Sequence, residues 1–134
     1  ASGEELPENV KAIIADCGYT SEWDEFKCEA NALHIPWFPV LNAASVMSKL
    51  RDGYDFKQAS ALEQVKQSRI PTLFIHGSDD ELVPYSMLDK LYSAAVCKKE
   101  CLTVNGAGHA LSSSVEPELY WNTVESFIDK YLEK

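Results

Sequence analysis

Basic residues are scarce in this sequence, and the few that are present do not gather into one patch. The 134-residue chain has 12 lysines and arginines against 21 aspartates and glutamates, which gives a formal net charge of −9. The one pair of adjacent basic residues is Lys98 and Lys99. A nucleic-acid binder needs a basic surface that neutralises phosphates. The composition therefore argues against a nucleic-acid partner.

Cysteine is too sparse for a disulfide-stabilised fold or for a zinc site recognisable from spacing. Small secreted disulfide domains are much denser in cysteine. Cys97 and Cys101 are four residues apart, but a zinc site of this kind would need a second pair, and no histidine is near in sequence. We therefore expect structural or inert roles for all the cysteines. Free cysteines favour a cytoplasmic location, although a cell-surface or secreted protein stays open. The four cysteines are Cys17, Cys28, Cys97 and Cys101.

Long apolar runs, repeats and low-complexity segments are also missing from the sequence. No stretch approaches the ~20 apolar residues of a membrane span, so no membrane association is expected of this segment, and no signal peptide is visible. A hydrophobic content of 46% is enough for the core of one domain over 1–134. Residues 1–7 look like the end of an earlier helix and loop. We therefore expect the chain to begin inside a longer protein.

Three short apolar runs predict the buried strands of a parallel sheet. They cover 10–16, 72–76 and about 101–104, and Pro71 and Gly77 bound the second run. Uninterrupted apolar runs are typical of strands that are buried on both faces. Helical patterns separate the runs, so the order predicts a three-layer α/β fold with parallel strands and right-handed crossovers.

The segment between the first two strands is longer than a crossover requires. Ser21 is a plausible N-cap of a helix that runs to about Leu33, and further helices are expected near 40–50 and 61–66. A minimal crossover is much shorter. We therefore interpret 21–69 as a helical insertion within the single domain. Long insertions at this edge of a sheet often cover an active site as a lid.

Polar side chains follow two of the predicted strands. The strand over 72–76 is followed by Gly77 and an acidic turn that contains Asp80, and the strand over 101–104 by a glycine-rich turn that ends in His109. Ligands of open α/β sheets bind at the carboxyl ends of the strands. A carboxylate and a histidine on neighbouring strand ends are two members of an acid–base–nucleophile relay.

These two turns resemble the carboxyl-terminal part of a serine α/β-hydrolase, in the branch of bacterial esterases and prolyl-oligopeptidase-like enzymes. The resemblance rests on 71–84, with Asp80 followed by Val83 and Pro84, and on Gly106-Ala107-Gly108-His109. It covers the whole chain, and it would make the three strands the sixth to eighth of the family's eight. It implies that Asp80 is the triad acid and His109 the general base.

The nucleophile of that family is missing from the sequence. No Gly-x-Ser-x-Gly occurs anywhere in the chain, whereas the serine of an α/β-hydrolase precedes the acid and the histidine. The serine and the oxyanion hole would then lie before Ala1. The resemblance implies hydrolysis of an ester or related acyl bond by the whole protein, without a metal or an organic cofactor. The chain alone is expected to be inactive.

Other carboxylates compete with Asp80 for the role of the acid. The Asp-x-x-Val-Pro spacing favours Asp80 over Asp79, and we interpret Asp79 and Glu81 as solvated turn or cap groups. Asp16 also ends a strand and is a conceivable substitute acid. A hydrogen bond that holds a loop explains Asp16 better.

Several further residues have both a structural and a functional interpretation. Cys17 does not lie in a Gly-x-Cys-x-Gly elbow, so it is not expected to be a nucleophile. His76 lies inside a strand, where a packed and hydrogen-bonded histidine is expected, and His34 has no partner by sequence. The candidates for a substrate pocket are aromatic, but packing of the insertion explains them equally well. They are Tyr19, Trp37 and Phe38.

Two other functions stay open beside the hydrolase. The chain could be a non-catalytic α/β module with a binding or regulatory role, or part of a split enzyme whose serine comes from another polypeptide. The residues before Ala1 would distinguish these possibilities. The sequence does not indicate which acyl group is processed, nor whether the bond is an ester or a peptide.

The first predicted strand, 10–16, also predicts a contact with another molecule. If no strand precedes it, its apolar edge is left unpaired. Such edges are templates for pairing with a second chain. We therefore expect self-association through this strand, for example as a two-fold dimer.

Overall fold

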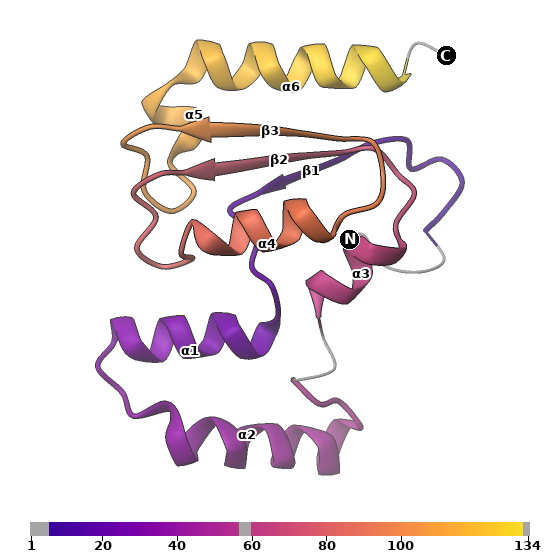
Figure 1. The fold of residues 1–134 in the computed structure, drawn as a ribbon. Coiled ribbons are helices and arrows are strands. Elements are labelled where there is room, and N and C mark those ends of the chain that lie inside the picture. The colour runs from indigo at the N-terminus through magenta and orange to yellow at the C-terminus, as the bar shows by residue number, and fades with distance from the viewer. Residues whose placement is uncertain (1–5, 57–59, 133–134) are drawn as a thin grey trace.

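The computed structural model describes residues 6–56 and 60–132, and its three strands are separated by helices as the sequence predicts. In chain order they are β1 (Ile13–Asp16), α1 (Glu22–Ala32), α2 (Trp37–Asp52), α3 (Ala61–Gln67), β2 (Thr72–Gly77), α4 (Ser86–Ala94), β3 (Lys99–Val104), α5 (Ser112–Val115) and α6 (Pro117–Leu132). Figure 1 shows this order from indigo at the N-terminus to yellow at the C-terminus. None of the helices in these ranges is both long and apolar enough to cross a membrane.

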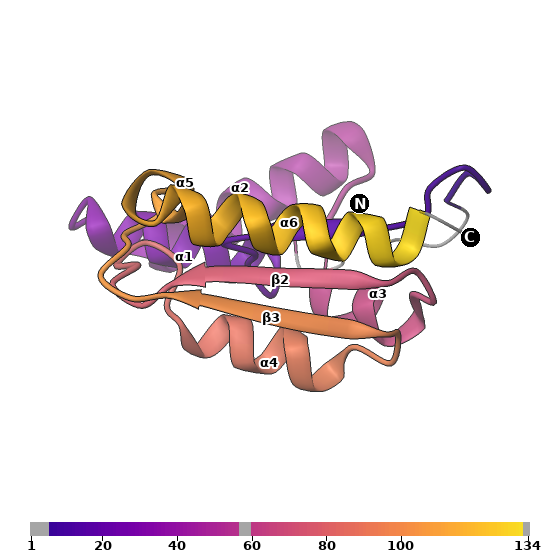
Figure 2. The ribbon, with the colours of Figure 1, turned by 90° about the horizontal axis from the view of Figure 1, so that it is seen from above.

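The strands form a parallel sheet in the order β1-β2-β3. Ile14 of β1 is in register with Leu73 of β2, and Phe74 of β2 with Cys101 of β3. The helix α6 runs along one face of the sheet, while α3 and α4 cover the other face (Figure 1 and Figure 2). These three layers confirm the predicted α/β fold. The three carboxyl ends of the strands meet at one edge of the sheet.

The central strand β2 explains why the core has two halves. Every residue of β2 is buried, as its uninterrupted apolar run predicts. Leu73 and Ile75 pack with Phe127 of α6 on one face of the sheet. Phe74 packs with Leu88 of α4 and with other residues on the opposite face. Side chains alternate between the faces of a strand, so this one strand joins both halves of the core.

Strand β1 is shorter than predicted and only partly buried. It begins at Ile13, not at Val10, because the N–H of Val10 donates to the carbonyl of Pro7 (2.9 Å) and closes a turn there. Its exposure alternates along the strand, and the side chain of Ile14 is 37% exposed. In the described part of the chain, the outer edge of β1 has no partner strand.

The described part of 21–69 contains the helices α1, α2 and α3. The Ser21 hydroxyl accepts the N–H of Asp24 (3.1 Å) and caps α1, as predicted. Helix α2 extends beyond the predicted 40–50 in both directions and ends at Gly53, whose positive φ of 70° terminates it. Figure 1 shows α1 and α2 as a pair farther from the sheet than α4. Whether this insertion works as a lid stays a prediction.

Candidate active site

The loops that follow β2 and β3 touch each other at the carboxyl edge of the sheet. The N–H of Asp79 donates to the carbonyl of Ala107 (3.0 Å), and the N–H of Gly106 donates to the Ser78 hydroxyl (2.8 Å). A Cβ on Gly77 would lie 2.1 Å from the carbonyl oxygen of Ala107. Only glycine therefore allows this close approach, which brings the two candidate residues of these loops together.

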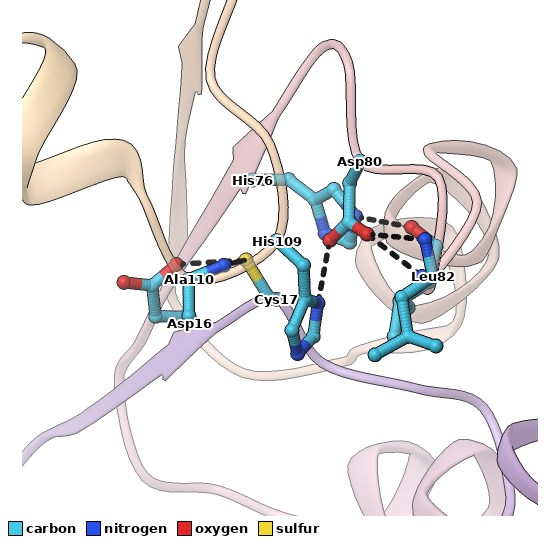
Figure 3. A network of polar contacts seen from close by, with 8 residues as sticks. Asp16, Cys17, His76, Asp80, Leu82, His109 and Ala110 are labelled. Atoms are coloured by element: carbon cyan, nitrogen blue, oxygen red, sulfur yellow. Dashed lines mark hydrogen bonds and ion pairs between the residues drawn. The ribbon is translucent and has the colours of Figure 1, made fainter. Parts of the chain in front are cut away.

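Asp80 is held by donors on both of its carboxylate oxygens. Oδ1 accepts the backbone N–H groups of Leu82 (3.0 Å) and Val83 (2.7 Å), and Oδ2 accepts Nδ1–H of His109 (2.8 Å), as Figure 3 shows. The side chain is fully buried. Two backbone donors prevent the carboxylate from rotating, so its second oxygen keeps facing His109.

The hydrogen bonds of Asp80 also decide its charge. Burial acts to raise the pKa of this carboxyl group, but the N–H of Val83, the His109 ring and the nearby His76 outweigh burial and lower the pKa below its ordinary value. Asp80 is therefore a carboxylate at neutral pH. A buried carboxylate of this kind favours positive charge on the imidazole that it contacts.

His109 combines an anchored nitrogen with an exposed ring. Its side chain is 38% exposed. Because Asp80 is ionised and can only accept, Nδ1 of His109 carries the proton in this hydrogen bond. Nε2 is then the basic nitrogen of the neutral ring. This is the tautomer that a general base needs when it takes a proton from a hydroxyl nucleophile.

His76 lies behind this pair and differs from the prediction in one respect. The ring is fully buried and packs edge-on against Tyr85, and its Nε2 donates to the carbonyl of Val83 (2.9 Å). Nε2 also lies 3.4 Å from Oδ2 of Asp80. However, Nδ1 of His76 has no hydrogen-bond partner among the described residues. The expectation of a fully hydrogen-bonded histidine is therefore wrong for this nitrogen, because the ring turns its other nitrogen to the backbone.

The end of a third strand, β1, also meets this site. The N–H of Ala110 donates to Sγ of Cys17 (3.3 Å), and the thiol donates to Oδ1 of Asp16 (3.3 Å; Figure 3). Oδ2 of Asp16 accepts the hydroxyl of Tyr120 from α6 (3.0 Å). This series of bonds, which we call the Asp16 tether, joins the loop of His109 to β1 and α6. Asp16 thus helps to hold the loop of His109, as we expected when we assigned it a structural hydrogen bond.

The backbone on both sides of the Asp16 tether has an uncommon conformation. Cys17 has φ of 52° and Ala110 has φ of 56°. Residues with a side chain rarely adopt this left-handed region, so the surrounding contacts must hold it. One sequence signal pointed to a role for Cys17 in this site: it directly follows a strand that ends at the carboxyl edge of the sheet. The contact itself joins positions 93 residues apart.

Cys17 is a poor nucleophile in this environment. Burial raises the pKa of its thiol, the N–H of Ala110 opposes the shift, and the hydrogen bond and charge of Asp16 add to it, so that the pKa reaches about 12. The thiolate is the reactive form of cysteine. The raised pKa of this thiol agrees with the interpretation that Cys17 is not a nucleophile.

The three aromatic pocket candidates do not come together. Tyr19 and the neighbouring Gly18 line a cavity of about 460 Å³ that lies against β1, β2 and α3. Trp37 and Phe38, at the start of α2, do not line this cavity. The Trp37 ring lies under the ammonium group of Lys27 (4.9 Å), and Phe38 is 66% exposed. Helix α2 therefore places Trp37 and Phe38 away from this cavity, and a substrate pocket that includes them stays a prediction.

The remaining alternatives lie outside the Asp80–His109 pair. Asp79 is exposed and accepts the Ser78 hydroxyl (2.6 Å), as expected of a turn residue. Glu81 is exposed. His34 is exposed where α1 ends, and its φ is 56°.

Comparisons with curated proteins give distant relatives. No family model matches the chain. It is 29% identical over 129 residues to the uncharacterized protein YqkD of Bacillus subtilis, which covers 96% of this chain and 42% of that protein. It is 29% identical over 106 residues to human alpha/beta hydrolase domain-containing protein 17C, covering 77% of this chain and 32% of that protein. The chain thus spans less than half the length of these relatives.

Solved structures share the fold of this chain. The Pyrococcus furiosus esterase PF2001 superposes with a TM-score of 0.68 at 19% identity, over 92% of this chain and 46% of the esterase. MGS-MChE2, an alpha/beta hydrolase from a lagoon-sediment metagenome, superposes with a TM-score of 0.58 at 12% identity, over 93% of this chain and 52% of that enzyme. At these identities the likeness concerns the fold alone.

Proposed function

We propose that this chain, which has an α/β-hydrolase fold and relatives that share it, is the carboxyl-terminal part of a serine hydrolase that cleaves ester or related acyl bonds. Its strands would correspond to the sixth, seventh and eighth of that fold. The observation that carries the proposal is the 2.8 Å hydrogen bond between His109 Nδ1 and the buried carboxylate of Asp80.

In this proposal His109 is the general base and Asp80 the triad acid. Nε2 of His109 takes the proton of a serine hydroxyl as the oxygen attacks the acyl carbon. It returns that proton to the leaving group when the tetrahedral intermediate collapses. Asp80 fixes the tautomer of the ring and stabilises the imidazolium between these two steps. The backbone donors Leu82 and Val83 keep the carboxylate in place throughout.

The serine and the oxyanion hole come from outside this sequence in our proposal. The chain contains no Gly-x-Ser-x-Gly, and it aligns with only 42% of the Bacillus subtilis relative. Without a nucleophile and without donors for the oxyanion, the chain alone is expected to show no turnover. The acyl substrate would belong to the whole protein.

The test compares the intact gene product with this chain on a chromogenic short-chain ester. His109→Ala in the intact protein is expected to lower kcat by about 10³-fold or more, as removal of a triad member does. The chain alone should hydrolyse the ester no faster than its own His109→Ala variant. An unchanged kcat in the His109→Ala variant of the intact protein would contradict the role of His109 as general base. An intact protein without a nucleophile elbow would favour the non-catalytic module.

A further inference from the structure

Three metal-ligating side chains of different kinds meet where the strands end. Cys17, Asp80 and His109 each offer one ligand atom, and these atoms lie within 4.8 Å of one another. They follow β1, β2 and β3 respectively. We propose that this trio binds Zn²⁺, and that the bound ion inhibits the hydrolase of which the chain is a part. The inhibition rests on the proposed function; the binding does not.

The spacing of the donor atoms fits a small cation after a modest contraction. Three atoms separated by at most 4.8 Å share a point that lies within about 2.8 Å of each of them. Zn²⁺ binds sulfur at ~2.3 Å and nitrogen or oxygen at ~2.0–2.2 Å. Each donor therefore moves inward by less than about 1 Å. Cys17 and Asp80 are buried, whereas His109 is 38% exposed and has room to move.

The chemistry of the donors selects zinc over the alkaline-earth cations. A thiolate, an imidazole and a carboxylate form a mixed set that suits a borderline-soft ion, whereas Mg²⁺ and Ca²⁺ prefer oxygen ligands throughout. Thiolate and carboxylate together balance the two positive charges of the ion. Asp16, whose Oδ1 lies 3.3 Å from the sulfur of Cys17, adds negative potential beside the site. With three protein ligands, the fourth position of a tetrahedral Zn²⁺ would be left to water.

When Zn²⁺ binds, it replaces the proton on the thiol of Cys17. The S–H bond of Cys17 breaks as the S–Zn bond forms, and the proton leaves to the buffer. The raised pKa of this thiol, about 12, opposes the step, so the metal must displace the proton as it coordinates. His109 binds through whichever ring nitrogen then carries no proton. In either case no free basic nitrogen is left to accept the proton of a serine, which is why the bound ion inhibits.

Cobalt(II) is the direct probe, because a thiolate bound to it gives a charge-transfer absorption band. Titration of this chain with Co²⁺ should produce the band with one equivalent of metal, and Zn²⁺ should abolish it by displacement. The band should be lost in Cys17→Ser and kept in Cys101→Ser, which removes an exposed thiol as a matched control. A wild-type chain without the band, or a band that survives Cys17→Ser, overturns the proposal.

A second variant covers the case in which Cys17→Ser fails to fold. His109→Ala changes an exposed side chain and should lower the affinity for Zn²⁺ at least about tenfold, since even the loss of a partner that only orients a metal ligand costs about 10–100-fold. An unchanged affinity for Zn²⁺ overturns the proposal.

Measurements on the intact protein distinguish the proposed metal site from the proposed hydrolase function. Zn²⁺ inhibition of ester hydrolysis that a chelator reverses supports both, whereas metal binding without any hydrolase activity leaves the site standing and removes the proposed function.

Discussion

Asp80 shows how one buried side chain can be fixed in both position and charge. Its carboxylate accepts two backbone N–H groups on one oxygen and the His109 ring on the other. Hydrogen bonds to a charged acceptor are about twice as strong as neutral ones, and here they outweigh the penalty of burial. The resulting low pKa has a consequence for the pH dependence of stability.

The chain should lose stability in acid partly through Asp80. Because the folded pKa of Asp80 is lowered below the unfolded value of ~3.9, this group stabilises the fold fully above the unfolded pKa. The contribution is lost as the pH falls through the folded pKa. Asp80→Asn should therefore lower the free energy of unfolding by about 1–3 kcal/mol at pH 7. Urea unfolding of both proteins from pH 7 to pH 3 measures this gap, and a gap that widens in acid would refute the assignment.

The Asp16 tether makes a second prediction at the scale of single residues. Tyr120→Phe keeps the ring in the core but removes the hydroxyl that donates to Asp16. The expected loss of unfolding free energy is about 1 kcal/mol, with faster hydrogen exchange at the amide of Ala110. Tyr92→Phe is the matched control, because that ring packs on Phe74 away from the tether. Equal exchange rates at Ala110 in both variants would show that the tether does not hold the loop of His109.

At the scale of elements, the turns after β2 and β3 decide whether the two site residues meet. Gly77 allows this contact, since any Cβ there would overlap the backbone of Ala107. Gly106 is different: its φ is 75°, but nothing lies within 4 Å of a Cβ added there. One glycine is required by close approach and the other only by its backbone angle.

Gly77→Ala should therefore cost more than Gly106→Ala. The first change forces the two turns apart. Overpacking typically costs about 1–3 kcal/mol and occasionally more, and here the Cβ would overlap backbone atoms that cannot turn aside. The second leaves a side chain in the left-handed region, which costs roughly 1–2 kcal/mol. Thermal unfolding of the two variants compares these costs. The reverse order would mean that the turns do not touch as the structure shows.

Much of the carboxyl edge of the sheet could be predicted from the sequence, because local chemistry determines it. Pro71 and Gly77 bound an uninterrupted apolar run, so β2 was predicted with nearly the observed ends. The turns that follow β2 and β3 carry Asp80 and His109, and parallel strands bring such turns to one edge. The predicted acid and base therefore lie together in the structure.

The features that the sequence does not predict depend on contacts between distant parts of the chain. The bond from Ala110 to Cys17 has no local signature, so the sequence indicated only an inert cysteine. The unpaired Nδ1 of His76 follows from the orientation of a buried ring. Trp37 and Phe38 are aromatic pocket candidates like Tyr19, but the arrangement of α2 separates them from it. Spacing along the chain determines none of these features.

At the scale of the whole molecule, the outer edge of β1 is open in the described part of the chain. Its outer side has no partner strand among the described residues, and Ile14 is 37% exposed beside the apolar cavity. We propose that a second copy of the chain pairs with this edge, as unpaired edge strands promote.

Light scattering tests this proposal. The isolated chain at high concentration should have a mass above the 15.0 kDa of one copy. Ile14→Lys should return it to one copy, because a lysine on an edge strand disfavours pairing. A wild-type mass of a single copy at all concentrations would count against the dimer.

The central claim is that Asp80 and His109 form one acid–base pair. The most direct measurement is NMR of this chain labelled with ¹⁵N in its histidines. We expect His109 to carry its proton on Nδ1, with a resonance shifted downfield and protected from exchange, and we expect that signal to disappear in Asp80→Ala. A His109 ring protonated on Nε2, or one that does not respond to Asp80→Ala, would contradict the account.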